Sequence, residues 1–188
     1  MPVDVTLPTA DGVLTLRPMR DTEADAAFHY ALFAATKAAD MATMPIDAAG
    51  KDFLLRMQYA SMTATYRRDY PAARFEVIEL AGEPIGRIVT DVGDACVTYV
   101  DLALLPFVQG RGLATALMLQ LLDEPRRLGL PARVSVLAQN ARSLKLFGRV
   151  GFVETGYVPP FVLLQWQAPA PTMSGFGKVG SRRDDGLG

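Results

Sequence analysis

Hydrophobic and polar positions divide the centre of the chain into a strand, a tight turn and a helix. Residues 99–105 are almost continuously apolar, which is typical of the end of a strand that is buried on both faces, and Pro106 stops it. Apolar residues then recur at helical spacing over residues 113–124. The turn at residues 109–112 contains two glycines, and the helix after it begins with free N–H groups. The pattern therefore predicts a turn where the backbone approaches an anion closely.

The same periodicities predict the remaining elements. Alternating or short apolar runs indicate strands at residues 13–17, 74–80, 85–91, 96–105, 132–137, 152–157 and 161–167. Helical spacing indicates further helices at residues 21–33, 51–69 and 141–150, with a loop at 34–50. We expect Asp21 or Thr22 to cap the first helix with Asp25 as capping-box partner, and Pro125 to end or kink the central helix.

Connection lengths predict a mixed α/β (α+β) sheet. Three successive strands, from residue 74 to residue 105, are joined by short turns and should form an antiparallel meander. The strand at 132–137 follows a helix and should therefore lie parallel to the strand at 96–105. Residues 1–168 are predicted to form one domain, whereas residues 169–188, rich in Pro, Gly, Ser and charge, are predicted to be a disordered tail.

Composition and charge narrow the classes of partner. The 188 residues contain 19 basic and 20 acidic side chains, which gives no reason to expect a nucleic acid or an anionic membrane as partner. Cys96 and His29 are the single cysteine and the single histidine, so we expect no internal disulfide and no zinc site. Cys96 is expected to be a buried small side chain and His29 to be packed or at the surface. No signal-peptide pattern is visible at residue 1, and we expect a cytoplasmic protein.

The turn at residues 109–115 fits two common phosphate-binding motifs poorly. A dinucleotide-binding fingerprint requires a glycine where Thr115 stands, and a nucleotide-binding P-loop requires a lysine that is absent. An ordinary strand-to-helix turn is the simplest alternative. Arg111 adds a positive charge beside the helix start, which favours an anion site.

Two separate motifs resemble those of the GNAT N-acetyltransferases. Gln109-x-x-Gly112-x-Ala114 is similar to the family's pyrophosphate-binding loop, and residues 136–152, with Asn140 and Phe147, resemble its strand–Asn-x-x-Ala/Ser-x-x-Leu-Tyr-x-x-x-Gly-Phe segment. The motifs occur in the family's order, and the resemblance covers about residues 13–167. It implies the GNAT fold, with a mostly antiparallel sheet whose fourth and fifth strands are parallel and splayed. It also implies acetyl transfer from acetyl-CoA to a primary amine, with no metal.

The resemblance assigns a set of residues to acetyl-CoA. The backbone of Leu102 and Leu104 would hydrogen-bond the pantetheine arm, and the amides of the turn would hold the pyrophosphate. Asn140 would contact the arm, cap the helix that follows it, or do both. The implied set is Leu102, Ala103, Leu104, Gln109, Gly110, Arg111, Gly112, Leu113, Ala114, Thr115, Asn140, Ser143 and Phe147.

The catalytic groups depart from the family pattern. Phe147 stands where many members have a tyrosine acid, and Thr98 and Ser135 stand where some have a glutamate base. Tyr157 could supply a hydroxyl, and the N–H of Leu104 could donate to the oxyanion. Strand alternation is expected to put Tyr99 and Asp101 together on the face opposite Thr98 and Leu102. The chain is thus either an enzyme that uses water to relay protons or a catalytically weak acetyl-CoA-binding module, and we favour the enzyme.

The acceptor remains open from sequence. Tyr59 and Tyr66 lie on one stripe of the helix at 51–69, where they either pack in the core or line an acceptor pocket. Acidic residues are scattered in this part of the chain, which does not indicate a polycationic substrate. A small amine or a peptide N-terminus is expected as acceptor, and a homodimer is an open alternative.

Overall fold

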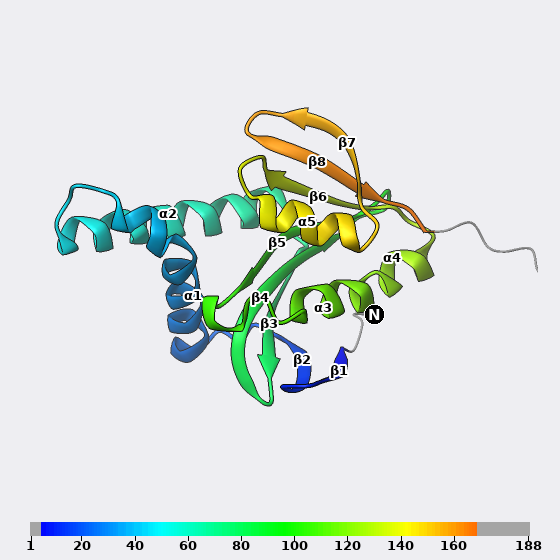
Figure 1. The fold of residues 1–188 in the computed structure, drawn as a ribbon, viewed down its shortest axis with the longest axis horizontal. Helices are drawn as coiled ribbons and strands as arrows, with labels where there is room; N and C mark the ends of the chain where they lie inside the picture. Colours follow the sequence, from blue (N-terminus) through cyan, green and yellow to red (C-terminus); the bar gives the residue numbers. More distant parts are fainter. Residues whose placement is uncertain (1–4, 169–188) are drawn as a thin grey trace, which may run out of the picture.

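One mixed sheet organises the fold (Figure 1). The computed structural model describes residues 5–168, so the tail predicted at 169–188 lies outside the described residues. Within them, the strands are ordered β1-β2-β3-β4-β5-β6-β8-β7, and every neighbouring pair is antiparallel except the parallel pair β5 and β6. The strands are β1 (Thr6–Thr9), β2 (Gly12–Pro18), β3 (Arg74–Leu80), β4 (Glu83–Val92), β5 (Val97–Leu104), β6 (Ala132–Leu137), β7 (Val153–Val158) and β8 (Phe161–Trp166).

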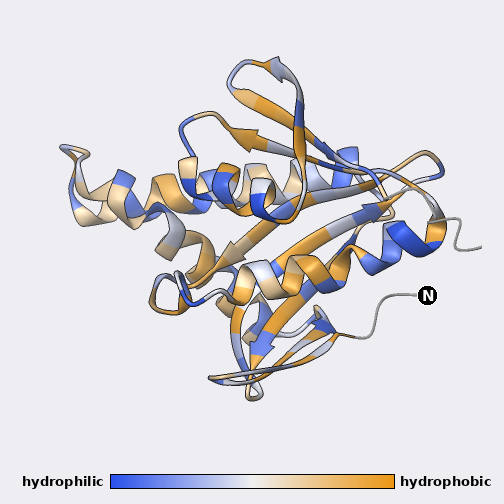
Figure 2. Ribbon diagram, turned by 45° about the vertical axis from the view of Figure 1, so that its right-hand side comes forward, coloured by the Kyte–Doolittle hydropathy of each residue, from blue (hydrophilic) through white to orange (hydrophobic). Residues whose placement is uncertain are grey.

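Helices cover both faces of the sheet. They are α1 (Glu23–Ala42), α2 (Ala48–Asp69), α3 (Leu113–Leu121), α4 (Asp123–Leu128) and α5 (Ala141–Arg149), with a short 3-10 turn η1 (Pro106–Val108) before α3. Ile78 and Ile88 are fully buried in the core cluster that contains Leu117 of α3. Their neighbours Val77 and Val89 are also buried but point to the other face, which α1 covers. Figure 2 shows the apolar residues along these central strands, whereas α4 is largely polar.

The antiparallel meander and the parallel β5–β6 pair are confirmed, whereas the end of the first helix and the number of strands differ from the predictions. The first helix continues through the predicted loop to Ala42, because this segment is rich in alanine, the strongest helix former, and buries Met41. As predicted for Pro125, the central helix does not continue unbroken: it is divided at Leu122 into α3 and α4, and Pro125 lies in the first turn of α4, where its missing N–H needs no intrahelical partner. The edge strand β1 is an addition, too short to show alternation.

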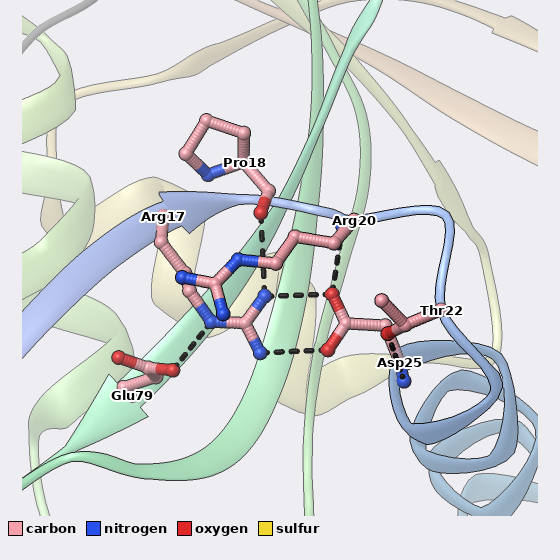
Figure 3. A network of polar contacts seen from close by, with 6 residues as sticks. All are labelled: Arg17, Pro18, Arg20, Thr22, Asp25 and Glu79. Carbon is pink, nitrogen blue, oxygen red and sulfur yellow. Dashed lines mark hydrogen bonds and ion pairs between the residues drawn. The ribbon is translucent and has the colours of Figure 1, made fainter.

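A polar network fixes the start of α1 on the sheet (Figure 3). Thr22 is the N-cap of α1, and its side chain accepts a hydrogen bond from the N–H of Asp25 (3.2 Å). The carboxylate of Asp25 does not complete a capping box. It accepts from the N–H of Arg20 (2.7 Å) and from the guanidinium of Arg17 on β2, which also binds Glu79 on β3 (2.6 Å). The prediction of Thr22 as the cap is therefore confirmed, while Asp25 serves the sheet instead.

Candidate active site

The parallel strands β5 and β6 separate soon after they begin. They pair at only two register positions, Val97 with Ala132 and Thr98 with Arg133, whereas β6 stays paired with β8 along its whole length. Figure 1 shows the two strands close together at one end and apart at the other. A cleft of about 540 Å³ lies at this opening and is lined by residues of β5, β6, α3 and α5.

The edge of β5 that faces the cleft carries free backbone groups. The N–H of Leu105 donates to the carbonyl of Ile85 on β4 (2.8 Å). Because successive N–H groups point to opposite sides of a strand, the N–H groups of Leu104 and Leu102 point away from β4 and toward the cleft. The carbonyl of Leu104 accepts a hydrogen bond from the side chain of Gln109 (2.7 Å). An extended ligand could therefore pair with this edge as a strand would.

The start of α3 faces the same cleft. Gly110 and Gly112 have φ angles of 83° and 80°, in the left-handed region that favours glycine. Gly112 is the N-cap of α3 and supplies no capping side chain, so within the described part of the chain no side-chain cap binds the N–H groups of the first helical turn. Leu113, Ala114 and Thr115 of that turn line the cleft. The predicted anion-binding turn has the geometry that such a site needs.

The positive charge beside this turn comes from α5, not from Arg111. Arg111 forms an ion pair with Asp11 in the β1–β2 turn and is not among the residues lining the cleft. Arg142 donates to the side-chain oxygen of Gln109, and its Nη2 lies 3.5 Å from where a Cβ would stand on Gly110. Arg142 was not predicted from the sequence.

Arg142 is one of three cations on the cleft side of α5. Lys145 and Arg149 follow it at spacings of three and four residues, which places all three on one helix face, and all three line the cleft. None of them forms an ion pair with a carboxylate of residues 5–168. Their spacing is visible in the sequence and was the signal that could have identified them.

Asn140 caps α5, as one of the two sequence-based alternatives predicted, and it also lines the cleft. Its side-chain oxygen accepts from the N–H of Ser143 (3.1 Å), which caps α5, and both residues line the cleft. Phe147 lies one turn further along α5, where it is buried against Phe152 with 5.2 Å between the ring centroids. Phe147 also lines the cleft and brings no proton to it.

A bulge in β5 separates Tyr99 from Asp101. Asp101 pairs with Val89 and Tyr99 pairs with Thr90, so Val100 between them has no partner on β4. The hydroxyl of Tyr99 donates to the carbonyl of Leu121 on the α3 face (2.9 Å), while Asp101 bonds to Arg87 on the other face. The prediction that these two side chains share a face is wrong, because an extra residue reverses the alternation after it.

Asp101 lies in a small group of polar side chains at the cleft. Its Oδ2 accepts from Nε of the buried Arg87 (2.6 Å), and Nη2 of Arg87 also contacts Sδ of Met62 on α2 (3.4 Å). Tyr66, one turn further along α2, lines the cleft together with Asp101. Burial, and next to it the negative charge of Asp101, raise the pKa of Tyr66 above its ordinary value, so its hydroxyl stays protonated.

Several other candidate residues lie away from the cleft lining. Thr98 lies where β5 and β6 are still paired, with its hydroxyl 3.7 Å from the half-buried thiol of Cys96. Tyr157 is 57% exposed on the edge strand β7. Tyr59 packs against Tyr30 and Phe33 of α1. Ser135 does line the cleft, whereas Ala103 does not.

Residues 5–168 provide neither a metal-binding cluster nor a membrane-spanning helix. No group of three or more His, Cys, Asp or Glu side chains is placed to hold a metal ion there. No helix of that segment is long and apolar enough to cross a membrane.

Comparison with known proteins matches this architecture. The model of the acetyltransferase (GNAT) family matches residues 43–152, more than half of the chain. The fold is similar to PaiA N-acetyltransferase from Thermoplasma acidophilum in complex with coenzyme A, at 13% identity and TM-score 0.63, covering 82% of this chain and 98% of that one. It is also similar to RimJ from Mycobacterium smegmatis in complex with CoA-disulfide, at 22% identity and TM-score 0.62, covering 87% and 86%.

A third similar structure is RimL, a ribosomal L7/L12 alpha-N-protein acetyltransferase in complex with coenzyme A. Its identity is 16% and its TM-score 0.57, with coverage of 89% of this chain and 97% of that one. A comparison with curated protein sequences finds no match.

Proposed function

The chain belongs to the acetyltransferase (GNAT) family, and we propose on this basis that it transfers the acetyl group of acetyl-CoA directly to a primary amine. The observation that carries the proposal is the early separation of β5 from β6, which pair at two register positions only. This separation leaves the N–H groups of Leu102 and Leu104 facing the cleft that ends at the start of α3.

The residues of the cleft fit acetyl-CoA by their chemistry. The pantetheine arm carries two amides, which can pair with the free edge of β5. The pyrophosphate can accept hydrogen bonds from the N–H groups between Gly112 and Thr115, beside the guanidinium of Arg142. The side-chain amide of Asn140 can donate to the arm, because only its oxygen is used in capping α5.

The chemistry needs a donor for the oxyanion and a route for protons. The N–H of Leu104, or of Leu102 two residues before it, can donate to the oxygen that becomes negative when the amine attacks. Phe147 supplies no proton for the departing thiolate. Tyr66 or Ser135, which both line the cleft, can donate a hydrogen bond to the sulfur directly or through water.

The acceptor proposed for this cleft is a small amine or the amino terminus of a peptide. The printed name of RimL assigns it a protein alpha-amino group as acceptor, which makes a peptide amine a reasonable first choice in a substrate panel. Tyr66 of α2 lines the cleft together with Asp101, so changes of sequence in the α1–α2 segment are expected to alter the acceptor preference.

A catalytically weak acetyl-CoA-binding module is the second candidate, and Phe147 is the observation that favours it. Calorimetric titration with acetyl-CoA, followed by measurement of thiol release against a panel of amines and peptides, separates the two. Binding with turnover supports the enzyme. Binding without turnover, together with activity gained by Phe147→Tyr, supports the module. A folded protein that does not bind acetyl-CoA contradicts both.

A further inference from the structure

Charges along the cleft are divided by sign. The charged residues of the described chain that line it are Arg142, Lys145 and Arg149 on α5 and a single carboxylate, Asp101 on β5. The three cations lie on the same side of the cleft as the start of α3, where the phosphates of the proposed donor would bind. Asp101 directly precedes Leu102, whose N–H faces the cleft. The cleft is therefore complementary to an anionic donor along α5 and to a cation beside β5.

The position of Asp101 depends on the bulge at Val100. Without the extra residue, the alternation of β5 would place Asp101 on the face of Tyr99, whose hydroxyl bonds to α3. With the extra residue, the side chain of Asp101 lies on the face covered by α1 and α2, next to Tyr66 at the cleft. Bulges commonly re-aim a side chain beside a functional site.

Arg87 holds one oxygen of the carboxylate and leaves the other one available. Nε of Arg87 donates to Oδ2 of Asp101 (2.6 Å), and Oδ1 accepts no hydrogen bond from residues 5–168. The side chain of Arg87 is 6% exposed and that of Asp101 is 19% exposed. Arg87 thus fixes the orientation of a carboxylate that retains access to the cleft.

We propose that Asp101 binds the ammonium group of the acceptor and takes its first proton, with Arg87 as the residue that positions it. This inference rests on the proposed acetyl transfer and adds the acceptor class: a primary amine that is protonated near neutral pH, such as an alkylamine or a peptide N-terminus. An uncharged aromatic amine has no ammonium group to bind and no ammonium proton to give up, so its acetylation does not need the carboxylate.

The proton balance is complete with the groups named. The acceptor ammonium gives one proton to Oδ1 of Asp101, and the nitrogen lone pair then forms a bond to the acetyl carbon. As the tetrahedral intermediate collapses, the carbon–sulfur bond breaks and the sulfur keeps the electron pair. The nitrogen loses its second proton, which neutralises the CoA thiolate, and Asp101 releases its own proton to water. One amide, one thiol and one proton result.

The test uses the full chain and compares Asp101→Asn with Asp94→Asn, an equal change of charge at an exposed carboxylate between β4 and β5. Acetyl-CoA affinity is measured by calorimetry, and kcat/KM is measured with an alkylamine or peptide identified in the panel and with an aniline. For Asp101→Asn we expect the alkylamine kcat/KM to fall about 100-fold or more, the aniline value to fall much less, and the acetyl-CoA affinity to stay within about twofold. Asp94→Asn should behave as the unchanged protein.

Two further variants separate a chemical role from a structural one. Formate should restore part of the alkylamine activity of Asp101→Ala, because it replaces the missing carboxylate. Arg87→Lys should keep a charge but lose the hydrogen bond from Nε, and should lower kcat more than it weakens acetyl-CoA binding.

Three results would overturn the inference. The first is an alkylamine kcat/KM of Asp101→Asn that lies within about threefold of the value for the unchanged protein. The second is loss of acetyl-CoA binding together with turnover, which would make the Arg87–Asp101 pair structural. The third is that Asp101→Asn lowers kcat/KM for the aniline by as much as it lowers kcat/KM for the alkylamine. If the unchanged protein binds acetyl-CoA but acetylates no amine, the proposed function itself fails, and this inference fails with it.

Discussion

Arg17 and Asp25 form a bidentate ion pair, with both guanidinium-to-carboxylate distances at 2.7 Å (Figure 3). The pair joins β2 to the first turn of α1, and the side chain of Asp25 is only 8% exposed. Because Arg17 also binds Glu79, one cation fixes three elements: β2, β3 and α1. Because α1 packs against β4 and β5, the strands that carry Arg87 and Asp101, this pair stabilises the scaffold of the candidate site.

Removing the carboxylate of Asp25 should therefore destabilise the fold. Asp25→Asn leaves the guanidinium of Arg17 partly buried with one acidic partner, and we expect a loss of about 3 kcal/mol in the free energy of unfolding. Urea denaturation at pH 7 measures it. Asp21→Asn, at an exposed position just before α1, is the matched control and should change stability by less than about 0.5 kcal/mol. A loss below about 1 kcal/mol for Asp25→Asn would contradict the role given to the pair.

The strand–turn–helix core, the meander and the parallel β5–β6 pair were predictable because they depend on local pattern and connection length. Residues 99–105 are apolar apart from Asp101 whichever way the sheet is built, and a strand that follows a single crossover helix is expected to lie parallel to the strand before that helix. The separation of β5 from β6 came only from the family resemblance. Nothing in the residue types at Val97 or Thr98 reveals where pairing stops.

Features that depend on one extra residue or on tertiary contacts were not predictable. The bulge at Val100 leaves no mark in the apolar pattern, yet it moves Asp101 to the opposite face. The ion pair of Arg111 with Asp11 joins a turn to a segment about 100 residues earlier in the chain. The sequence alone could not show that the side chain of Arg111 is already paired with a carboxylate. Arg142 stands at an unspecified position of the Asn-x-x-Ala/Ser motif, between Asn140 and Ser143, so the motif did not single it out.

The buried histidine predicts a pH dependence of stability. His29 is buried, and its Nε2 has no hydrogen-bond partner among residues 5–168; burial, followed by the positive charge of Arg87, lowers its pKa from 6.5 to about 4. The unfolded chain binds a proton below pH 6.5, but the folded protein does not until about pH 4. Its folded pKa is therefore the lower one, and stability should fall as pH decreases from 6.5 to 4, by on the order of 3 kcal/mol.

The variant His29→Gln isolates this effect, because the chain has no other histidine. Unfolding free energies of both proteins are measured by urea titration between pH 7 and pH 4. The difference between them should shrink or reverse toward pH 4. Burial raises the pKa of Glu76, which contributes with the opposite sign, but it is common to both proteins and cancels in the difference. A difference that stays constant with pH would contradict the buried neutral state of His29.

Two arginines near the α3 turn should differ in their effect on acetyl-CoA binding. Arg142→Ala removes the guanidinium next to Gly110 and should weaken binding about 10- to 100-fold, as expected for a charge-assisted hydrogen bond to phosphate. Arg111→Ala removes a side chain that is paired with Asp11, and its effect should be less than about threefold. Calorimetry at two salt concentrations measures both. The sequence motif alone gives the reverse order, so the reverse result would favour it over the structure.

Two glycine substitutions test whether the turn needs its left-handed backbone. A Cβ on Gly112 would meet no atom within 4 Å, so Gly112→Ala is strained only by its φ of 80°. That strain costs about 1–2 kcal/mol and should be relieved by a shift of the turn, which would weaken acetyl-CoA binding about tenfold or more. Gly148→Ala lies inside α5, also in open space, and should instead stabilise the protein by about 0.5–1 kcal/mol without changing acetyl-CoA affinity. Thermal unfolding measures the stability of both variants, and calorimetry measures their affinity for acetyl-CoA. Unchanged binding by Gly112→Ala would mean that the N–H groups at the start of α3 do not hold the phosphate.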